Sequence, residues 1–369
     1  MKNKLSTIQY LRGFAALLVL FSHVETNFNV FTNPGLTGAD RSHFDGQFGV
    51  GVFFVISGFI MYHISGRSFG SARSGVDFFV RRFLRIAPLY WLCTFGAAVL
   101  LLKSGKLSFD LTSIKHIILS VLFIPYDFAE DKFRPVHDLG WTLNYEMFFY
   151  AIFALSLTMR RKIGLAFTFF IFLGLVALGL TDPSSSALMA WTRPVILLFL
   201  FGITLGMIYE RYGARLPRLS EPVALAILVV GFLVQTWLYN LRIGYHPASL
   251  EAHPLYWTLA IAMVCVGLCA SAPSRPEALL PRGLLTLGDS SFSLYLTHPF
   301  AIFVMVGIWV HTGQRIPAPI MIVATCVAAI IGGYVCYRWI ELPMHRYART
   351  MLTRRAVNSP PIEAKVSSN

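Results

Sequence analysis

Runs of about 20 apolar residues recur along nearly the whole chain, and this feature restricts the fold more than any other. A helix of about 20 residues spans roughly 30 Å, which is the thickness of the hydrocarbon core of a membrane. Only 13% of the residues are charged, about half the share found in soluble domains. The sequence therefore predicts an all-α polytopic membrane protein with about ten transmembrane helices. The predicted spans are 8–28, 47–65, 84–103, 140–159, 163–181, 188–209, 223–241, 254–272, 288–311 and 318–341.

The basic residues predict the orientation of these spans. The chain has 31 lysines and arginines and a formal net charge of +13. If the N-terminus is inside, 20 of the 31 lie in cytoplasmic segments and 8 in outside segments, as the positive-inside rule requires. This distribution predicts that both termini are cytoplasmic. It also explains the positive charge without a nucleic acid, which would need a basic face with interleaved aromatic residues.

Two segments depart from the pattern of spans. Within residues 104–139 the apolar core 114–124 is too short to cross, so we expect an interfacial or re-entrant piece in the longest outside loop. That loop is either a docking place for a polar acceptor or a solvated linker. Residues 346–369 are predicted to be a basic, disordered cytoplasmic tail, which leaves residues 1–345 as one membrane domain. The five cysteines lie in apolar runs without zinc-like spacing, so no metal is expected.

Two ionisable residues in the first span are the first candidates for a functional site. Arg12 and His23 are eleven residues apart, which places them within about 20° of each other on a helix and roughly 16 Å apart along it. Ionisable side chains in a membrane span usually face a protein interior or a watery cavity. The alternative is that Arg12 extends its charge to one membrane surface while His23 is a satisfied polar residue near the other.

Glu146 and His298 are further polar residues inside predicted spans. Glu146 lies about 9 Å from the predicted outer end of its span, at nearly the depth of His23. A buried carboxylate needs a partner, so we expect it to pair with a histidine or with a polar substrate, unless it is a clamp between helices. His298 precedes Pro299, which frees a backbone carbonyl and bends the helix, so it marks either a polar cavity wall or a packing kink.

Arg82 and Arg85 lie in a basic segment predicted to join the second and third spans on the cytoplasmic side. Their spacing of three places them on one face of a helical turn. Two guanidinium groups side by side suit the oxygens of a phosphate. Basic cytoplasmic loops are also common under the positive-inside rule alone. Composition therefore does not decide between a phosphate site and an ordinary basic loop.

These residues together resemble the membrane-bound acyltransferase family 3. The motifs that carry the resemblance are Arg12 with His23, Phe53-Phe-Val-Ile-Ser-Gly-Phe59, Arg82-Phe-Leu-Arg85, Trp141-Thr-Leu-Asn-Tyr-Glu146 and Tyr295-Leu-Thr-His298. They occur in the family's order over about the first 345 residues. The opening Ile8-Gln-Tyr-Leu-Arg-Gly-Phe-Ala-Ala is most similar to the branch that acetylates bacterial exopolysaccharides.

The resemblance implies acyl transfer, usually of acetyl, from cytoplasmic acetyl-CoA to a sugar hydroxyl of a lipid-linked or nascent glycan. It implies that His23 is the catalytic histidine and Arg12 its partner, and that Arg82 and Arg85 bind the phosphates of coenzyme A. We expect Glu146 to orient His23. Trp141, Asn144 and His298 are expected to face substrate or cavity. The implied location is the bacterial inner membrane, where membrane lipids and polysaccharide assembly machinery are the neighbours.

Other mechanisms and functions are compatible with the same residues. His23 can act as a general base on the hydroxyl or as the carrier of the acyl group. A transporter or flippase for a glycan or anionic substrate would use His23, Glu146 and His298 as a proton relay. A non-catalytic scaffold in a polysaccharide assembly complex is a third class.

Overall fold

The structure is a computed structural model that describes residues 6–35, 42–127, 134–241, 254–269, 279–347 and 350. These residues form helices and their connections, without any β-strand, so the predicted all-α class is confirmed. The helices are α1 (Ser6–Thr32), α2 (Gly46–Ser65), α3 (Ala72–Lys103), α4 (Leu111–Val121), α5 (Gly140–Leu157), α6 (Arg161–Gly179), α7 (Ser186–Trp191), α8 (Leu197–Tyr212), α9 (Glu221–Asn240), α10 (Pro254–Cys269), α11 (Leu279–Asp289), α12 (Ser291–His311) and α13 (Ala318–Cys336).

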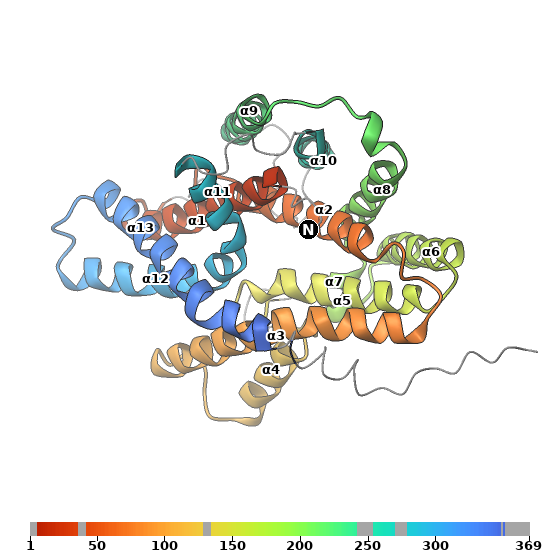
Figure 1. Ribbon diagram of the computed structural model, residues 1–369. Coiled ribbons are helices and arrows are strands. Elements are labelled where there is room, and N and C mark those ends of the chain that lie inside the picture. The colour runs from red at the N-terminus through yellow and green to blue at the C-terminus, as the bar shows by residue number, and fades with distance from the viewer. Residues whose placement is uncertain are drawn as a thin grey trace, which may run out of the picture.

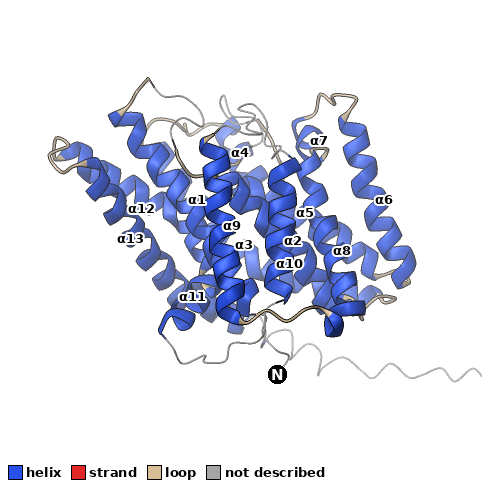
Figure 2. Ribbon diagram, turned by 90° about the horizontal axis from the view of Figure 1, so that it is seen from above, coloured by secondary structure: helices blue, strands red, loops and turns tan. Residues whose placement is uncertain are grey.

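The long helices run side by side, with short α4 and α7 near one end of the bundle and α11 near the other (Figure 2). Figure 1 shows α1 and α2 in the middle, α9 and α10 on one side of them and α3 and α5 on the other. The closest neighbours of α1 are α2, α11 and α12, whereas α5 packs mainly against α3 and α6. This arrangement decides which of the predicted site residues can meet.

Eight helical segments in the described ranges are long and apolar enough to cross a membrane. The other two predicted spans, 140–159 and 254–272, correspond to α5 and α10. The polar Asn144 and Glu146 lie within α5, and α10 has 16 residues. The multi-pass architecture is therefore confirmed, while the count of ten and the cytoplasmic termini stay predictions. The predicted tail lies almost entirely outside the described residues.

The third span begins earlier than the sequence predicted. Helix α3 starts at Ala72 rather than near residue 84, so Arg82 and Arg85 lie inside a helix of 32 residues and not in the loop before it. The first turns of α3 are held by aromatic contacts, with the rings of Phe78 and Phe153 5.3 Å apart. Charged residues in these turns lower the local hydropathy, so a search for runs of apolar residues places the start of this span too late.

The short apolar segment in the predicted outside loop is helix α4, whose 11 residues are too few to cross a membrane, as predicted. Its Leu111, Ile114 and Ile118 are exposed on one face. The indole Nε1 of Trp91 donates a hydrogen bond to the carbonyl of Val121, 3.0 Å away, and attaches α4 to α3.

The last membrane segment contains a π-helical turn, Tyr337–Glu341, directly after α13. Cys336 and Glu341 are both buried although they are five residues apart. In a regular α-helix a spacing of five turns the second side chain away from the first, whereas one π turn returns it to the same side. Glu341 thereby reaches α12, where it accepts a hydrogen bond of 2.5 Å from Ser293.

Helices α2 and α8 touch through their backbones. A Cβ atom on Gly58 would lie 2.1 Å from the carbonyl oxygen of Phe199, and one on Gly202 would lie 2.2 Å from that of Val55. Both glycines therefore permit an approach that no larger residue allows.

Asp45 begins α2 and is buried among polar groups outside the span. Its side chain accepts hydrogen bonds from the backbone N–H of Gln47, at 3.0 Å, and from the side-chain amide of Gln235 on α9, at 3.1 Å. Burial raises the pKa of the Asp45 carboxyl to about 6, against the lowering effect of the backbone N–H groups of Phe48 and Gln47.

Gly58→Ala is expected to destabilise the protein by about 3 kcal/mol, because the added methyl group collides with the backbone of α8. The control is Gly307→Ala on α12, where no atom lies within 4 Å of the new Cβ, and its stability should match or slightly exceed the wild type. Thermal unfolding in detergent measures both. Equal unfolding temperatures for the two variants would contradict the close contact.

Asp45→Asn is expected to change how stability depends on pH. Because the folded-state pKa is raised, the folded protein favours the neutral carboxyl, and stability is lost as pH rises from about 4 through 6. Asparagine stays neutral and still caps α2. The variant should match the wild type near pH 3.5 and exceed it by up to about 3 kcal/mol near pH 7.5. A pH-independent difference between them would contradict this.

Candidate functional site

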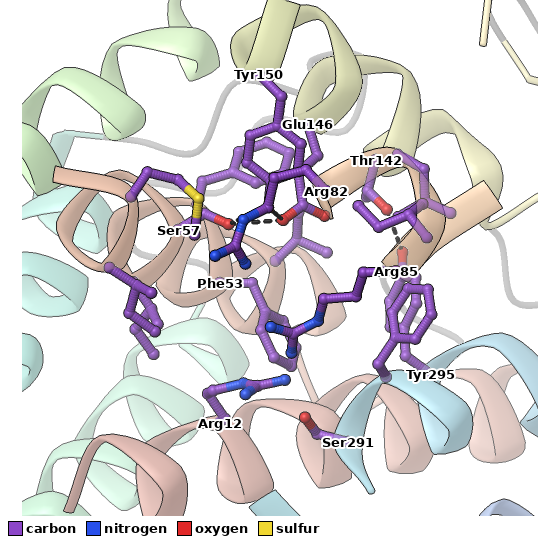
Figure 3. A pocket seen from close by; sticks show the side chains of 18 residues that line it. Arg12, Phe53, Ser57, Arg82, Arg85, Thr142, Glu146, Tyr150, Ser291 and Tyr295 are labelled. Atoms are coloured by element: carbon purple, nitrogen blue, oxygen red, sulfur yellow. Dashed lines mark hydrogen bonds between the residues drawn. The ribbon is translucent and has the colours of Figure 1, made fainter. Parts of the chain in front are cut away.

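A cavity opens between five helices in the middle of the bundle (Figure 3). One wall is α2, and α1, α3, α5 and α12 provide the rest. The polar residues that line it are Arg12, Ser57, Arg82, Arg85, Thr142, Glu146, Tyr150, Ser291 and Tyr295, and the apolar remainder includes Phe53 and Phe54. Of the predicted site residues, Arg12, Arg82, Arg85 and Glu146 are thus brought together here.

Three guanidinium groups enter this cavity from two helices. Arg12 comes from α1, and Arg82 and Arg85 come from one face of α3, as their spacing predicted (Figure 3). Arg12 donates to Gln9 at 3.2 Å, and the guanidinium of Arg82 lies 5.8 Å from the centroid of the Phe78 ring. The Nε of Arg82 is buried and has no hydrogen-bond partner among the described residues. The cluster therefore has unused capacity to bind an anion.

Glu146 is the one carboxylate among the residues that line the cavity. It accepts a hydrogen bond of 2.6 Å from Ser57 on α2 and another from Tyr150, one helical turn further along α5. No ion pair joins it to any of the three arginines in the described structure. Two hydroxyl groups thus hold the carboxylate in place, and in the lining of the cavity three guanidinium groups stand against one carboxylate.

The expected pairing of Glu146 with His23 is not formed. Sequence position places the two residues at similar predicted depth, but α5 packs mainly against α3 and α6, and α1 is not among its main neighbours. Depth along two helices says nothing about whether those helices are neighbours. The carboxylate instead lines the cavity together with the arginine cluster, and His23 is not part of that lining.

His23 makes its polar contact with His298. Nδ1 of His23 lies 2.9 Å from Nε2 of His298 on α12, and the ring centroids are 5.2 Å apart. His298 is only 1% exposed, whereas His23 is partly accessible. His298 is therefore part of a paired site and not merely a residue next to a kink.

Tyr295 connects the cavity to this histidine pair. It lines the cavity, its hydroxyl lies 2.9 Å from that of Thr142, and its ring is 6.2 Å from Phe53. Its ring centroid is also 6.3 Å from that of His298, one turn further along α12. Tyr295 thus contacts both the cavity that holds the arginine cluster and the histidine pair.

Trp141 and Asn144 are buried in α5 and do not line the cavity. The ring of Trp141 meets that of Tyr145 edge to face at 6.0 Å. Both polar atoms of the Asn144 amide are buried without a hydrogen-bond partner in the described structure. Their predicted contact with substrate stays a prediction.

Sequence reasoning missed the hydroxyl groups of the site. Tyr150 follows Glu146 by four residues, a spacing that brings two side chains together on a helix. This contact could therefore have been predicted from the sequence. Ser57 lies in a stretch of small residues that indicates helix packing, and Tyr295 lies three residues before His298. Nothing in the sequence around Ser57 or Tyr295 predicts that either residue lines a cavity. In the described ranges no cluster of His, Cys, Asp or Glu side chains is arranged to hold a metal ion.

The chain matches known proteins over most of its length. A family model described as an acyltransferase domain matches residues 5–338. The exopolysaccharide production protein ExoZ of Rhizobium meliloti (strain 1021) is 36% identical over 306 residues, which cover 82% of this chain and 91% of that protein. No solved structure matches the chain.

Two further relatives match the chain at lower sequence identity. Nodulation protein 10 of Rhizobium leguminosarum bv. viciae is 26% identical, with 94% of each chain covered. The putative peptidoglycan O-acetyltransferase YrhL of Bacillus subtilis (strain 168) is 24% identical over 94% of this chain and 55% of its own length.

Proposed function

The chain belongs to the acyltransferase domain family and is a multi-pass membrane acyltransferase, and we propose that it moves an acetyl group from acetyl-CoA to a sugar hydroxyl of an exopolysaccharide or its lipid-linked precursor. Similarity to the exopolysaccharide production protein ExoZ supports a polysaccharide acceptor. Similarity to a putative peptidoglycan O-acetyltransferase supports an O-acetyl product. The distribution of basic residues supports an inner-membrane orientation with the donor arriving from the cytoplasm.

The observation that carries the proposal is the cluster of three arginines in a cavity with a single carboxylate that is already hydrogen-bonded. Such a cavity favours a ligand with several negative charges, as the phosphates of coenzyme A provide. Arg82 and Arg85 would bind these phosphates. Arg12 lies on the same helix as His23, and the donor would extend roughly 16 Å along α1 to bring its thioester to the histidine.

His23 would supply the chemistry that a thioester donor lacks. A thioester is already activated, so the difficult part of the reaction is to make a sugar hydroxyl nucleophilic. A neutral imidazole accepts a proton near neutral pH and can return it to the leaving thiolate. His23 is partly accessible and hydrogen-bonded, as a general base must be.

Arg82→Met and Arg85→Met are each expected to weaken acetyl-CoA binding by about 10- to 100-fold, because each removes a charge-assisted hydrogen bond to phosphate. Binding to the purified protein and release of free thiol from acetyl-CoA measure the effect. Arg81→Met is the matched control, since Arg81 is a neighbouring exposed arginine that does not line the cavity. Unchanged binding in both cavity variants would rule out this phosphate site.

His23→Ala is expected to abolish O-acetyl esters on the surface polysaccharide, which NMR of polymer from cells with matched protein levels detects. Acetyl-CoA binding should remain, because His23 does not line the arginine cavity. If esters persist while export of the polymer falls, the protein is a transporter and not the enzyme proposed here.

Glu146→Gln is expected to tighten acetyl-CoA binding several-fold, because it removes the negative charge that competes with the donor for the three arginines. Glutamine retains an oxygen that accepts the hydrogen bonds of Ser57 and Tyr150. The dissociation constant, measured at low and high salt, tests this. Loss of binding in this variant would show that Glu146 orders the arginines and does not oppose the donor.

A further inference from the structure

The surroundings of His298 determine which of its ring nitrogens carries a proton. Nδ1 of His298 lies 3.1 Å from the backbone carbonyl oxygen of Leu294 in the preceding turn of α12. A carbonyl oxygen can only accept a hydrogen bond, so Nδ1 must donate. In a neutral imidazole the other nitrogen, Nε2, then carries the lone pair.

Pro299 reinforces this assignment. Proline has no backbone N–H, so the carbonyl of Tyr295, four residues earlier, loses its helical donor. That carbonyl also interacts with the His298 ring. Two backbone oxygens therefore favour a proton on the side of the ring that faces them.

His298 is held in a neutral state by its surroundings. It is 1% exposed, and its hydrogen-bond partners are backbone carbonyls and His23, none of which is negatively charged. An imidazolium here would be a buried charge without a counter-ion, which is costly. The adjacent His137 is 3% exposed, and burial lowers its pKa to about 4, so it adds no charge near neutral pH.

The two charged groups that act electrostatically on His23 compensate each other. They are Asp138 and Arg134, from the segment before α5. These two form an ion pair with 2.7 Å between Nη1 of Arg134 and a carboxylate oxygen of Asp138. The hydrogen bond to His298 is therefore the specific polar contact that distinguishes the two nitrogens of His23.

We infer that His298 is a positioning residue that fixes the tautomer of His23. Because Nε2 of His298 accepts, Nδ1 of His23 must donate across their 2.9 Å contact. Nε2 of His23 then carries the lone pair on the side of the ring away from His298. This inference rests on the proposed function. It identifies Nε2 of His23 as the nitrogen that takes the proton and His298 as the residue that keeps this nitrogen unprotonated.

With this tautomer of His23, every bond and proton of the acyl-transfer step is accounted for. Nε2 of His23 takes the proton of the sugar hydroxyl while the sugar oxygen bonds to the thioester carbonyl carbon. The carbon–sulfur bond breaks, and the thiolate takes the proton back from Nε2, giving the ester and free coenzyme A thiol. Throughout, Nδ1–H of His23 keeps its hydrogen bond to His298, which therefore orients the ring without touching the substrate, as the third member of a triad does.

The tautomer of His23 can be measured directly in the wild-type protein. Solid-state NMR of [¹⁵N]histidine-labelled protein in lipid bilayers, with His23 assigned by its loss in His23→Gln, distinguishes a protonated from an unprotonated ring nitrogen. We expect neutral His23 to have a protonated Nδ1 and an unprotonated Nε2. A protonated Nε2 would overturn the inference, whatever the variants do.

Two substitutions of His298 separate positioning from packing. Glutamine can donate its amide N–H to Leu294 and present its oxygen to His23, so His298→Gln should retain turnover within about tenfold. Phenylalanine fills the space but offers no hydrogen-bond acceptor to His23. His298→Phe should therefore lower turnover by about 100-fold or more, which is the rate enhancement that a positioned general base provides. Acetyl-CoA binding should be unchanged in both. His311→Phe, an exposed histidine at the end of the same helix, is the control.

The outcomes distinguish this inference from the function on which it rests. Full turnover in His298→Phe, with none in His23→Ala, would overturn the positioning role and leave the acyltransferase proposal intact. Full turnover in His23→Ala would overturn both. Low turnover in His298→Phe, with a mixed His23 tautomer and rescue by glutamine, supports the inference.

Discussion

The rest of the structure depends on the cost of keeping three guanidinium groups together inside a membrane protein. Arg12, Arg82 and Arg85 repel one another, and the carboxylate that shares their cavity is engaged by Ser57 and Tyr150. Such a cluster persists only if the helices that carry it cannot move apart. Helix α1 packs against α2, which also lines the cavity, and the aromatic contact of Phe78 with Phe153 holds α3 against α5, so the walls that carry the cluster are held in place. The unbalanced charge then becomes available to an anionic donor.

The two ends of the site are built by different chemistry, and this division suits a reaction with two unlike substrates. The arginine end offers fixed positive charge. The histidine end offers a neutral pair whose proton positions are set by backbone carbonyls of α12. Helices α1 and α12 pack against each other and each contribute to both ends, with Tyr295 at the junction. A change in how these two helices pack would therefore affect donor and acceptor together.

Sequence reasoning predicted what depends on one helix and missed what depends on neighbouring helices. The shared face of Arg82 and Arg85 and the polar character of α1 follow from helical periodicity, and both appear in the structure. The partner of His23 could not be predicted in the same way. Glu146 has a suitable depth and charge, but neighbours in a bundle are set by side-chain packing over whole helices, which no local pattern encodes. The early start of α3 was missed because its first turns are amphipathic and not uniformly apolar. The resemblance to a known family supplied the remaining step, from a set of polar residues to acyl transfer.

The π turn at Tyr337–Glu341 has a consequence for how the sequence of this helix can change over evolution. It accommodates one residue more than an α-helical path would, so a single-residue deletion there would restore regular geometry instead of breaking the helix. After such a deletion Glu341 would stand four residues after Cys336 in a regular α-helix, a spacing that keeps both side chains on one face. Glu341 would therefore still face Ser293 on α12, whereas a deletion elsewhere in this helix would rotate everything after it by about 100°. The π turn is therefore a position where this helix can lose one residue and keep its contact with α12, which neither hydrophobicity nor helix propensity would reveal.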